Sequence, residues 1–288
     1  MTHFKTIGIF TKPQDDRVKE TLTTLVKHLE KHTISYIVDT KGASYLGTDG
    51  FSYDEMASQI DLAIIMGGDG TLLHTGRFLA PFDIPILGIN LGRVGFLVDV
   101  TPDDMTTIID QVLAGHYIEE KRTLLGAAVY RGDELLGKHD ALNDVVFHVR
   151  NKVHMVEFTT HINNTFVNTQ RADGVVIATP TGSTAYALSS GGPIIHPGLD
   201  VLALVPICPN TLSHRPIVIN ASDTIEITLC EGRYSEARIS YDGQSQIDII
   251  SGDRAVISKK DYAMTLLHPK NHDYYHLLRA KLHWSIQH

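Results

Sequence analysis

The sequence predicts two domains: an N-terminal Rossmann-like parallel α/β domain, then a β-rich, sandwich-like domain. A C-terminal segment is expected to return to the first domain. In the N-terminal part, short apolar runs alternate with amphipathic helical patterns, which is typical of a parallel sheet. From Leu124 to Lys260 short runs of period two dominate, whereas Pro269 to Trp284 has a helical pattern again. We therefore place the α/β domain at residues 1–122, the β-rich domain at 123–264 and the returning segment at 265–288.

The N-terminal elements follow from their apolar spacing. In Asp15–Lys31 the residues Val18, Leu22, Leu25 and Leu29 recur at helical intervals. Lys41–Ser52 is rich in glycine and polar residues and is predicted to be a mobile connection. The expected strands are Lys5–Phe10, Ser35–Asp39, Leu62–Met66 and Pro85–Asn90, and the expected helices are Asp15–Lys31, Thr71–Ala80 and Asp103–Ala114.

The β-rich part is built from short alternating runs that turn residues separate, as at Asn163-Asn164. The tail Pro269–Trp284 is predicted to be helical and to pack on the first domain. The expected strands are Ala127–Tyr130, Asp144–Val149, Val156–Ile162, Phe166–Gln170, Val175–Ala178, Ile225–Leu229, Ala237–Tyr241 and Ala255–Ser258.

Composition narrows the class of protein. The chain has 288 residues and a formal net charge of -8, so it lacks the general basic field that attracts nucleic acid. Its two cysteines have no metal-type spacing, which favours a reducing cytoplasm. We expect no signal peptide and no membrane segment, because every apolar run is too short. The sixteen histidines are scattered without a zinc motif, so we predict no protein metal site.

The segment Asp61–Thr71 is the first candidate site. A buried strand ends in Gly67, Gly68 and Gly70, and a helix follows, which together make a phosphate seat. Asp69 would repel a phosphate, so its presence indicates a metal ligand or a proton acceptor. A tight turn with an exposed aspartate would also explain the pattern, which is neither a Walker loop nor the dinucleotide fingerprint.

A second glycine-rich segment, Gly88–Leu97, also follows a strand. The carboxyl ends of parallel strands meet at one edge, so we expect it beside Gly67–Gly70.

Two further segments carry polar groups in the β-rich part. Thr179–Thr184 is dense in hydroxyls and leads into a helical turn at Ala185–Ser189, which suits ribose, amide or phosphate groups. A capped helix after a turn would explain the same residues. Asn143-Asp144 begins an apolar strand and is either an ordinary turn or a fork for two sugar hydroxyls.

Taken together and in this order, these motifs closely resemble those of the bacterial ATP-dependent NAD kinases. The resemblance extends from about Ile7 to Trp284. It rests on Gly67-Gly-Asp-Gly70, Asn143-Asp144, Arg171-Ala-Asp-Gly174, Thr179-Pro-Thr-Gly-Ser-Thr-Ala-Tyr186, Gly88–Phe96 and Ser240-Tyr-Asp-Gly-Gln244.

The resemblance implies the reaction NAD + ATP → NADP + ADP at the 2′-hydroxyl of the adenosine ribose. Asp69 would accept the hydroxyl proton, and the glycines Gly67, Gly68 and Gly70 would seat phosphate while Mg²⁺ arrives with ATP. Asn143 and Asp144 would bind ribose hydroxyls. The other implied NAD-binding residues are Phe96, His154, Arg171, Asp173, Thr184, Ala185, Tyr186, Ala187, Leu188, Ser189 and Gln244.

The resemblance leaves rival interpretations. The family usually has Asn-Glu where this chain has Asn143-Asp144, and aspartate reaches one methylene less. Diacylglycerol and sphingosine kinases share the glycine–aspartate turn, but the Thr179–Tyr186 block favours NAD over a lipid. A non-catalytic NAD-binding regulator would not need Asp69. The resemblance also implies a homo-oligomer, a tetramer or dimer, with sites near subunit contacts.

Overall fold

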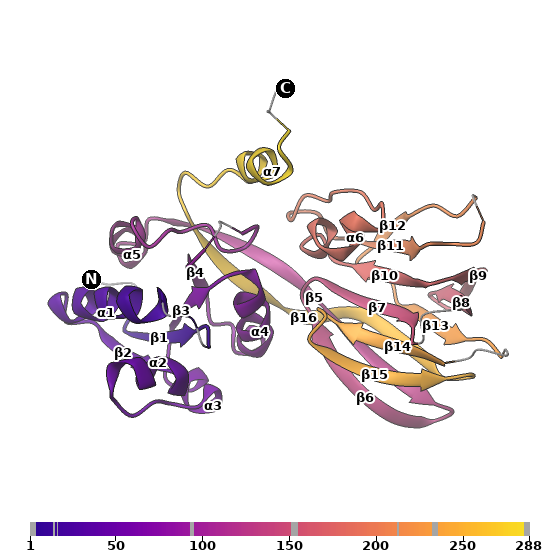
Figure 1. Ribbon diagram of the computed structural model, residues 1–288, viewed down its shortest axis with the longest axis horizontal. Helices are drawn as coiled ribbons and strands as arrows, with labels where there is room; N and C mark the ends of the chain where they lie inside the picture. Colours follow the sequence, from indigo (N-terminus) through magenta and orange to yellow (C-terminus); the bar gives the residue numbers. More distant parts are fainter. Residues whose placement is uncertain are drawn as a thin grey trace. The chain divides into compact units, whose positions relative to one another are not determined.

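The computed structural model describes residues 4–13, 15, 17–92, 95–150, 155–211, 213–231 and 236–284. The chain divides into two compact units, residues 1–121 with 264–288 and residues 122–263. Two long strands, β5 (Tyr117–Arg131) and β16 (Arg254–Pro269), each continue from one unit into the other (Figure 1).

The first unit is a parallel sheet flanked by helices. The sheet order is β2 (Ser35–Val38), β1 (Thr6–Thr11), β3 (Leu62–Gly67), β4 (Ile86–Asn90) and the last part of β16. The helices are α1 (Arg17–Lys31), α2 (Thr40–Leu46), α3 (Tyr53–Ala57), α4 (Asp69–Leu79), α5 (Met105–Leu113) and α7 (Tyr274–Leu282), with a 3₁₀ turn at Ala80–Phe82.

Alternation along the strands explains the helices on both faces of this sheet. Ile7 and Ile9 point into an apolar cluster with the buried faces of α1 and α5. Phe10 points the other way and meets Tyr53 of α3 edge-on, with ring centroids 4.9 Å apart. The strands are therefore buried on both sides, as a parallel sheet requires.

The prediction of a mobile connection at Lys41–Ser52 is wrong, because α2 occupies much of it. The buried Asp39 carboxylate caps this helix by accepting from the Gly42 N–H at 2.8 Å. A Cβ on Gly42 would lie 2.6 Å from Val38 Cγ1, so this glycine lets α2 approach the sheet. Gly47 ends α2 in the left-handed region at φ 70°.

The second unit is a sandwich of two antiparallel sheets. One sheet has the order β12 (Ile217–Asn220), β11 (Val201–Ile207), β10 (Gly174–Ala178), β7 (Asp144–Val149), β14 (Glu236–Tyr241) and β15 (Ser245–Ile250). The facing strands are the first part of β16, then β13 (Ile225–Leu229), β8 (Val156–Ile162) and β9 (Thr165–Ala172), while β5 pairs with both β16 and β6 (Glu134–Ala141).

The core of the second unit lies between its sheets. Phe147 of β7 and Phe158 of β8 meet there with ring centroids 5.0 Å apart. The outer face of the six-stranded sheet is covered by Ala187 of α6 (Tyr186–Ser189) and by Ile195. The predicted fold class, a parallel α/β part followed by a β-rich part with a returning C-terminal segment, is confirmed. Within the described residues, no helix has the length and apolar character needed to cross a membrane.

Candidate active site

The predicted site residues form two groups, one in each unit. Gly67, Gly68, Asp69, Gly70 and Phe96 belong to the first unit, and the others that the structure describes belong to the second. His154 lies outside the described residues.

The glycine turn joins β3 directly to α4. Gly68 is the N-cap of α4 and supplies no side-chain cap, so the first turn of this helix is left to other partners. A Cβ on Gly68 or Gly70 would meet nothing within 4 Å. The Gly68 backbone, at φ -129° and ψ -171°, suits any residue. Neither packing nor torsion requires glycine at position 68, and the bare main chain leaves space for a ligand at a helix N-terminus.

Asp69, the first residue of α4, has its carboxylate held by the second glycine-rich segment. Oδ2 accepts from the Phe96 N–H at 2.8 Å, and Oδ1 accepts from the N–H groups of Leu97 and Val98 at 3.2 Å each. A carboxylate offers about four acceptor positions, so about one remains, on Oδ2. The group is oriented and retains one acceptor position for a hydroxyl.

The close approach at Asp69 depends on Gly95. A Cβ there would lie 1.9 Å from Asp69 Oδ1, which is a direct overlap. Asn90 braces the same segment, since its amide donates to Val98 O at 3.0 Å and its Oδ1 accepts from Gly92 N at 2.7 Å. The two glycine-rich segments, expected at one sheet edge, are thus bonded to each other.

A charged group at the same edge was not predicted. Asp15 accepts from Arg17 Nε at 2.9 Å and from Lys12 Nζ at 3.1 Å, just beyond the end of β1. The hydrogen bond from Arg17 holds the pKa of Asp15 well below its usual range. A Cβ on Gly92 would lie 3.3 Å from Arg17 Nη1, so this guanidinium lies beside the second glycine-rich segment. The Arg17 guanidinium thus places a positive charge near the second glycine-rich segment.

In the second unit, Asn143-Asp144 is held by Asp242, which lies in the Ser240–Gln244 motif but was not among the predicted site residues. The single carboxylate of Asp242 accepts hydrogen bonds from the N–H groups of Leu142, Asn143 and Asp144, at 3.0, 2.8 and 3.1 Å. Asp242 and Gly243 have φ values of 50° and 65°, typical of a type I′ hairpin turn between β14 and β15. Asp242 N also donates to Asp144 O at 3.0 Å, and Gln244, which ends the turn, is exposed.

Asp144 is a perturbed carboxyl at this site. It is 4% exposed. Burial, and then the nearby charge of Asp242, raise its pKa to about 7. A carboxyl that titrates near neutral pH is typical of functional sites, although structural groups also do so.

The hydroxyl-rich segment clamps the same backbone. Thr179 Oγ1 donates to Leu142 O at 2.5 Å, and Thr179 N donates to Asn143 O at 2.9 Å. A Cβ on Gly182 would lie 2.0 Å from Asn143 O, so only glycine permits this approach. The Thr179 hydroxyl therefore holds the loop together, as expected if the hydroxyl-rich segment is a turn before a capped helix.

The helical turn after this loop presents a mixed face. Tyr186 is 47% exposed and Ser189 is exposed, whereas Thr184, Ala185 and Leu188 are half-buried. Ala187 is buried against Val146, Val176 and Val205. Tyr186 is thus the residue in this turn with a ring available for stacking.

Arg171 and Asp173 are not brought to this loop within one chain. Asp173 precedes β10 and Thr179 follows it, so the two lie roughly 20 Å apart along the strand. Arg171, on β9, is 61% exposed and lies 3.9 Å from Glu157 Oε2. Asp173 N instead donates to Ile207 O at 3.0 Å.

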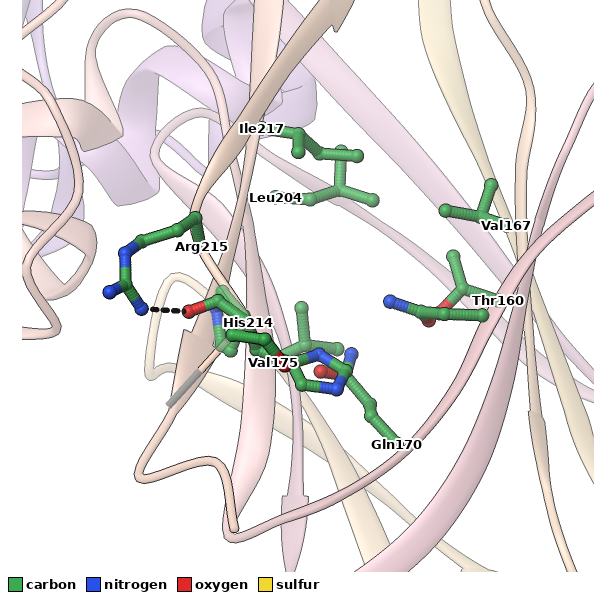
Figure 2. Close-up of a pocket in the computed structure, with 11 residues that line it drawn as sticks. Thr160, Val167, Gln170, Val175, Leu204, His214, Arg215 and Ile217 are labelled. Atoms are coloured by element: carbon green, nitrogen blue, oxygen red, sulfur yellow. Dashed lines mark hydrogen bonds between the residues drawn. The ribbon is translucent and has the colours of Figure 1, made fainter. Parts of the chain in front are cut away.

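A cavity of about 310 Å³ in the second unit contains none of the predicted residues. Thr160 and Gln170 line it with His214 and Arg215 (Figure 2). Thr160 Oγ1, Asn168 Oδ1 and Gln170 Oε1 are buried without a hydrogen-bond partner among the described residues. No residue of the Asn143 loop or of the Thr179–Ser189 segment lines this cavity, so it is not assigned to the reaction.

A glycine turn at a helix N-terminus beside a fixed carboxylate is typical of enzymes that transfer phosphate from a nucleotide. The family models of the ATP-NAD kinase N-terminal and C-terminal domains match residues 7–117 and 142–268. The chain belongs to the ATP-NAD kinase family.

Individual relatives belong to the same family. An NAD kinase of Nitrosococcus oceani is 45% identical to this chain, and the match covers 98% of this chain and 97% of the relative. An NAD kinase of Nitrosomonas europaea is also 45% identical, over 98% of this chain and 96% of its own. The structure of yeast NADH kinase complexed with NADH aligns with a TM-score of 0.90 at 25% identity, covering 99% of this chain and 89% of that one. An NAD kinase from Archaeoglobus fulgidus in complex with ATP aligns with a TM-score of 0.77 at 24% identity, over 98% of this chain and 100% of that one, which supports the fold.

Proposed function

We propose that this chain transfers the γ-phosphate of ATP to the 2′-hydroxyl of the adenosine ribose of NAD, forming NADP. Membership of the ATP-NAD kinase family supports the reaction. The observation that carries the mechanism is the oriented Asp69 carboxylate, with one acceptor position left at the start of α4.

Asp69 is proposed as the proton acceptor. A hydroxyl that attacks phosphorus must lose its proton, and a positioned carboxylate can take it as the bond to phosphorus forms. The N–H groups of Phe96, Leu97 and Val98 hold this carboxylate in place. Phosphoryl transfer depends mainly on such positioning and on charge neutralisation.

The triphosphate is proposed to lie against the bare Gly67–Gly70 turn. The open space at Gly68 and Gly70 and the helix N-terminus support this placement. Lys12 and Arg17 add positive charge at the same sheet edge.

Mg²⁺ is proposed to enter with ATP. Of the described residues, two groups could hold a metal, and each contains two histidines rather than only oxygen ligands. A hard cation that keeps several waters and binds phosphate oxygens does not need a protein cage. Bound Mg²⁺ would neutralise phosphate charge.

NAD is proposed to bind the Asn143 loop. Asn143 and Asp144 would take ribose hydroxyls, and Tyr186 would stack on a ring. The clamp formed by Asp242 and Thr179 supports this, because it fixes the fork before a ligand arrives. Gln244, Thr184, Ala185, Leu188 and Ser189 are proposed to line the same pocket.

The enzyme is proposed to be a homo-oligomer whose sites are completed by a second copy. The separation of Asp173 from the Asn143 loop supports this. The edge strands β9 and β12 also expose Phe166, Val167 and Val218. The cytoplasm is the proposed location, since the cysteines Cys208 and Cys230 are free.

The test is conversion of NAD to NADP by the purified chain with Mg-ATP. Asp69→Asn should abolish turnover while NAD affinity stays within about tenfold, because the substitution removes the base in the first unit and NAD is proposed to bind the Asn143 loop of the second. Asp83→Asn makes the same change at an exposed position of the same unit and should be fully active. An Asp69→Asn enzyme with activity comparable to the parent would exclude Asp69 as the base. A parent chain that binds NAD without turnover would instead indicate the non-catalytic regulator.

A further inference from the structure

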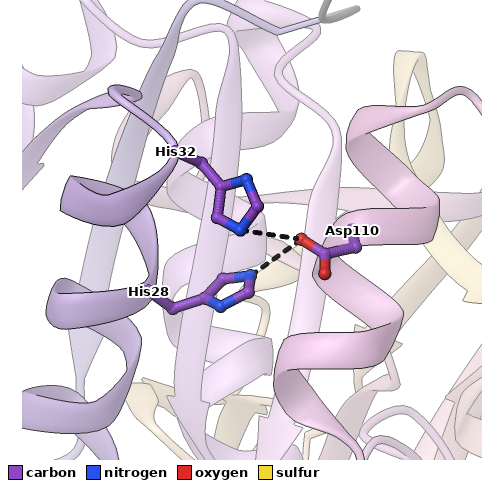
Figure 3. Close-up of side chains that lie close together, drawn as sticks. All are labelled: His28, His32 and Asp110. Carbon is purple, nitrogen blue, oxygen red and sulfur yellow. Dashed lines mark hydrogen bonds and ion pairs between the residues drawn. The ribbon is translucent and has the colours of Figure 1, made fainter.

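Two helices of the first unit bring two imidazoles and a carboxylate together. His28 lies near the end of α1, His32 lies one residue past it, and Asp110 lies on α5 (Figure 3). His28 Nε2 is 2.8 Å from Asp110 Oδ1, and His32 Nε2 is 3.9 Å from the same oxygen. These three ligand atoms all lie within 4.8 Å of one another.

The positions of these side chains are set by packed helices. Leu25 and Leu29 of α1 and Ile109 of α5 are buried in one apolar cluster. His32 N donates to His28 O at 3.3 Å, so the helical turn continues and the two rings share one face. The pair therefore projects toward Asp110 from a supported backbone.

The spacing of the ligand atoms fits a tetrahedral transition-metal ion. Atoms bonded at about 2.0–2.1 Å to such an ion lie about 3.3–3.4 Å from one another. The 2.8 Å and 3.9 Å separations lie on either side of that value, and the two imidazole nitrogens lie within 4.8 Å of each other, so side-chain adjustment would bring all three atoms onto one ion. The side chains of His32 and Asp110 are 43% and 50% exposed, which gives an ion access and leaves room for a bound water.

We propose that His28 Nε2, His32 Nε2 and Asp110 Oδ1 bind one divalent transition-metal ion of the Zn²⁺ class. Imidazole suits Zn²⁺, Ni²⁺ or Cu²⁺, whereas Mg²⁺ prefers oxygen ligands. Binding through Nε2 requires the ring hydrogen of His28 to lie on Nδ1, so the ion would replace the hydrogen bond between His28 Nε2 and Asp110 Oδ1. The ion would join α1 to α5.

This site is separate from the proposed reaction. Helix α1 begins after the carboxyl end of β1 and finishes before the amino end of β2, so its end lies at the amino edge of the sheet. Gly67–Gly70 follows the carboxyl end of β3, at the opposite edge. The ion would therefore act on the stability of the first unit, not on the chemistry.

A second group in this unit, Asp99, His268 and His272, is a poorer metal site. Its imidazoles are stacked, with centroids 3.8 Å apart and planes at 25°. The burial of His268 leaves an ion little access to the ring nitrogens of this group. Both Nδ1 atoms already face Asp99 Oδ2, and His268 is 1% exposed.

The experiment is a titration of the metal-free full chain with Zn²⁺, by calorimetry, and with Co²⁺, by visible absorption. We expect one ion per chain and the absorption of tetrahedral Co²⁺. Zn²⁺ at about 100 times its Kd should raise Tm by on the order of 5 °C. NADP formation should be unchanged in His32→Ala.

Variants locate the ion. His32→Ala and Asp110→Asn should each weaken Zn²⁺ binding by more than about tenfold, because each removes a direct ligand. His272→Ala removes a ligand of the rival group and should leave binding intact. No stoichiometric binding by the folded parent, or binding lost in His272→Ala and kept in His32→Ala, would overturn the proposal.

Discussion

At the scale of single residues, two glycines near Asp69 have different roles. Gly95→Ala puts a Cβ where Asp69 Oδ1 lies, 1.9 Å away, so the carboxylate must move. We expect kcat to fall about 100-fold, because a displacement of about 1 Å at a catalytic group has effects of that size. In Gly68→Ala the added methyl group would lie in open space, so Tm should not change. The methyl group would occupy the proposed place of the triphosphate, so kcat/KM for ATP should fall. Initial rates and melting curves of both variants test this, and a fully active Gly95→Ala enzyme would exclude the close approach.

Asp144 makes the second unit sensitive to pH. Its pKa in the folded chain is raised to about 7 from an ordinary 3.8, so folding favours the protonated form. Its contribution to stability is complete below the unfolded pKa and is lost as pH rises through 7. Asp144→Asn should therefore stabilise the unit at pH 8 by on the order of 2 kcal/mol and have little effect at pH 4.

Urea unfolding of Asp144→Asn at both pH values measures that difference. Asp133→Asn, an exposed carboxyl of the same unit, is the matched control and should change neither midpoint. An equal gain at pH 4 and pH 8 would mean that the substitution acts through packing and not through the charge.

The residue types of the candidate site could be predicted from the sequence, but their supports could not. Asp69 and Asn143-Asp144 stand in motifs that can be recognised by inspection. Asp242 bonds to Asp144 N from 98 positions along the chain, and Phe96 N reaches Asp69 across 27 positions. Such partners depend on the register of strands, which no local pattern records.

At the scale of elements, three strands of the β-rich part were predicted to the residue. β7, β8 and β13 have the predicted bounds. β6 and β15 were missed because charged or polar residues interrupt their apolar period, and β11 because its continuous apolar run has no period. α2 was missed because a buried cap at Asp39 outweighs the glycine and polar content of its sequence.

The junction between β16 and α7 carries an ionic network that no motif indicated. Asp99 Oδ2 lies 3.1 Å from His268 Nδ1 and 2.7 Å from His272 Nδ1, and His268 Nε2 lies 3.2 Å from Glu120 Oε2. The Glu120 contact is an ion pair of poor hydrogen-bond geometry, since this Nε2 has no hydrogen-bond partner in the described chain. Burial alone would lower the pKa of His268, but Asp99 and Glu120 outweigh it and raise the pKa.

The pH dependence of this network has two limits. The raised His268 pKa gives stability that is complete below about 6.5 and lost as pH rises through the folded value. Burial would raise the pKa of Asp99, but both histidines lower it, so its contribution is present above about 3.8 and lost in acid. The network should stabilise the first unit most between about pH 4 and 6.5.

His268→Gln should lower the stability of the first unit at pH 6 by about 1–3 kcal/mol, and by less at pH 9. Thermal unfolding across this range is the measurement. The control is His276→Gln, which changes an exposed histidine of α7. Its stability should depend on pH as that of the parent does. A loss that is the same at every pH would assign His268 a packing role alone.

At the scale of the whole molecule, the two ends of β10 bear on the homo-oligomer proposed above. Asp144 pairs with Ala178 at one end of this strand, and Asp173 stands beyond the other end, so one chain does not present both to one nucleotide. A second copy related by a two-fold axis would bring its Asp173 to the Asn143 loop of the first, and the reverse. Each site would then combine residues of two chains.

Such sharing predicts complementation between inactive variants. Asp144→Asn and Asp173→Asn chains, each weakly active alone, should form mixed dimers in which one site carries both changes and the other carries neither. With random mixing, half of the dimers are mixed and half of their sites are intact, so about a quarter of the parent activity should return. The measurement is NADP formation after the two variants are unfolded and refolded together, with each refolded alone as the control. Activity that stays at the average of the two separate variants would mean that each chain builds its site alone, and Asp173 would then have to act from its own end of β10.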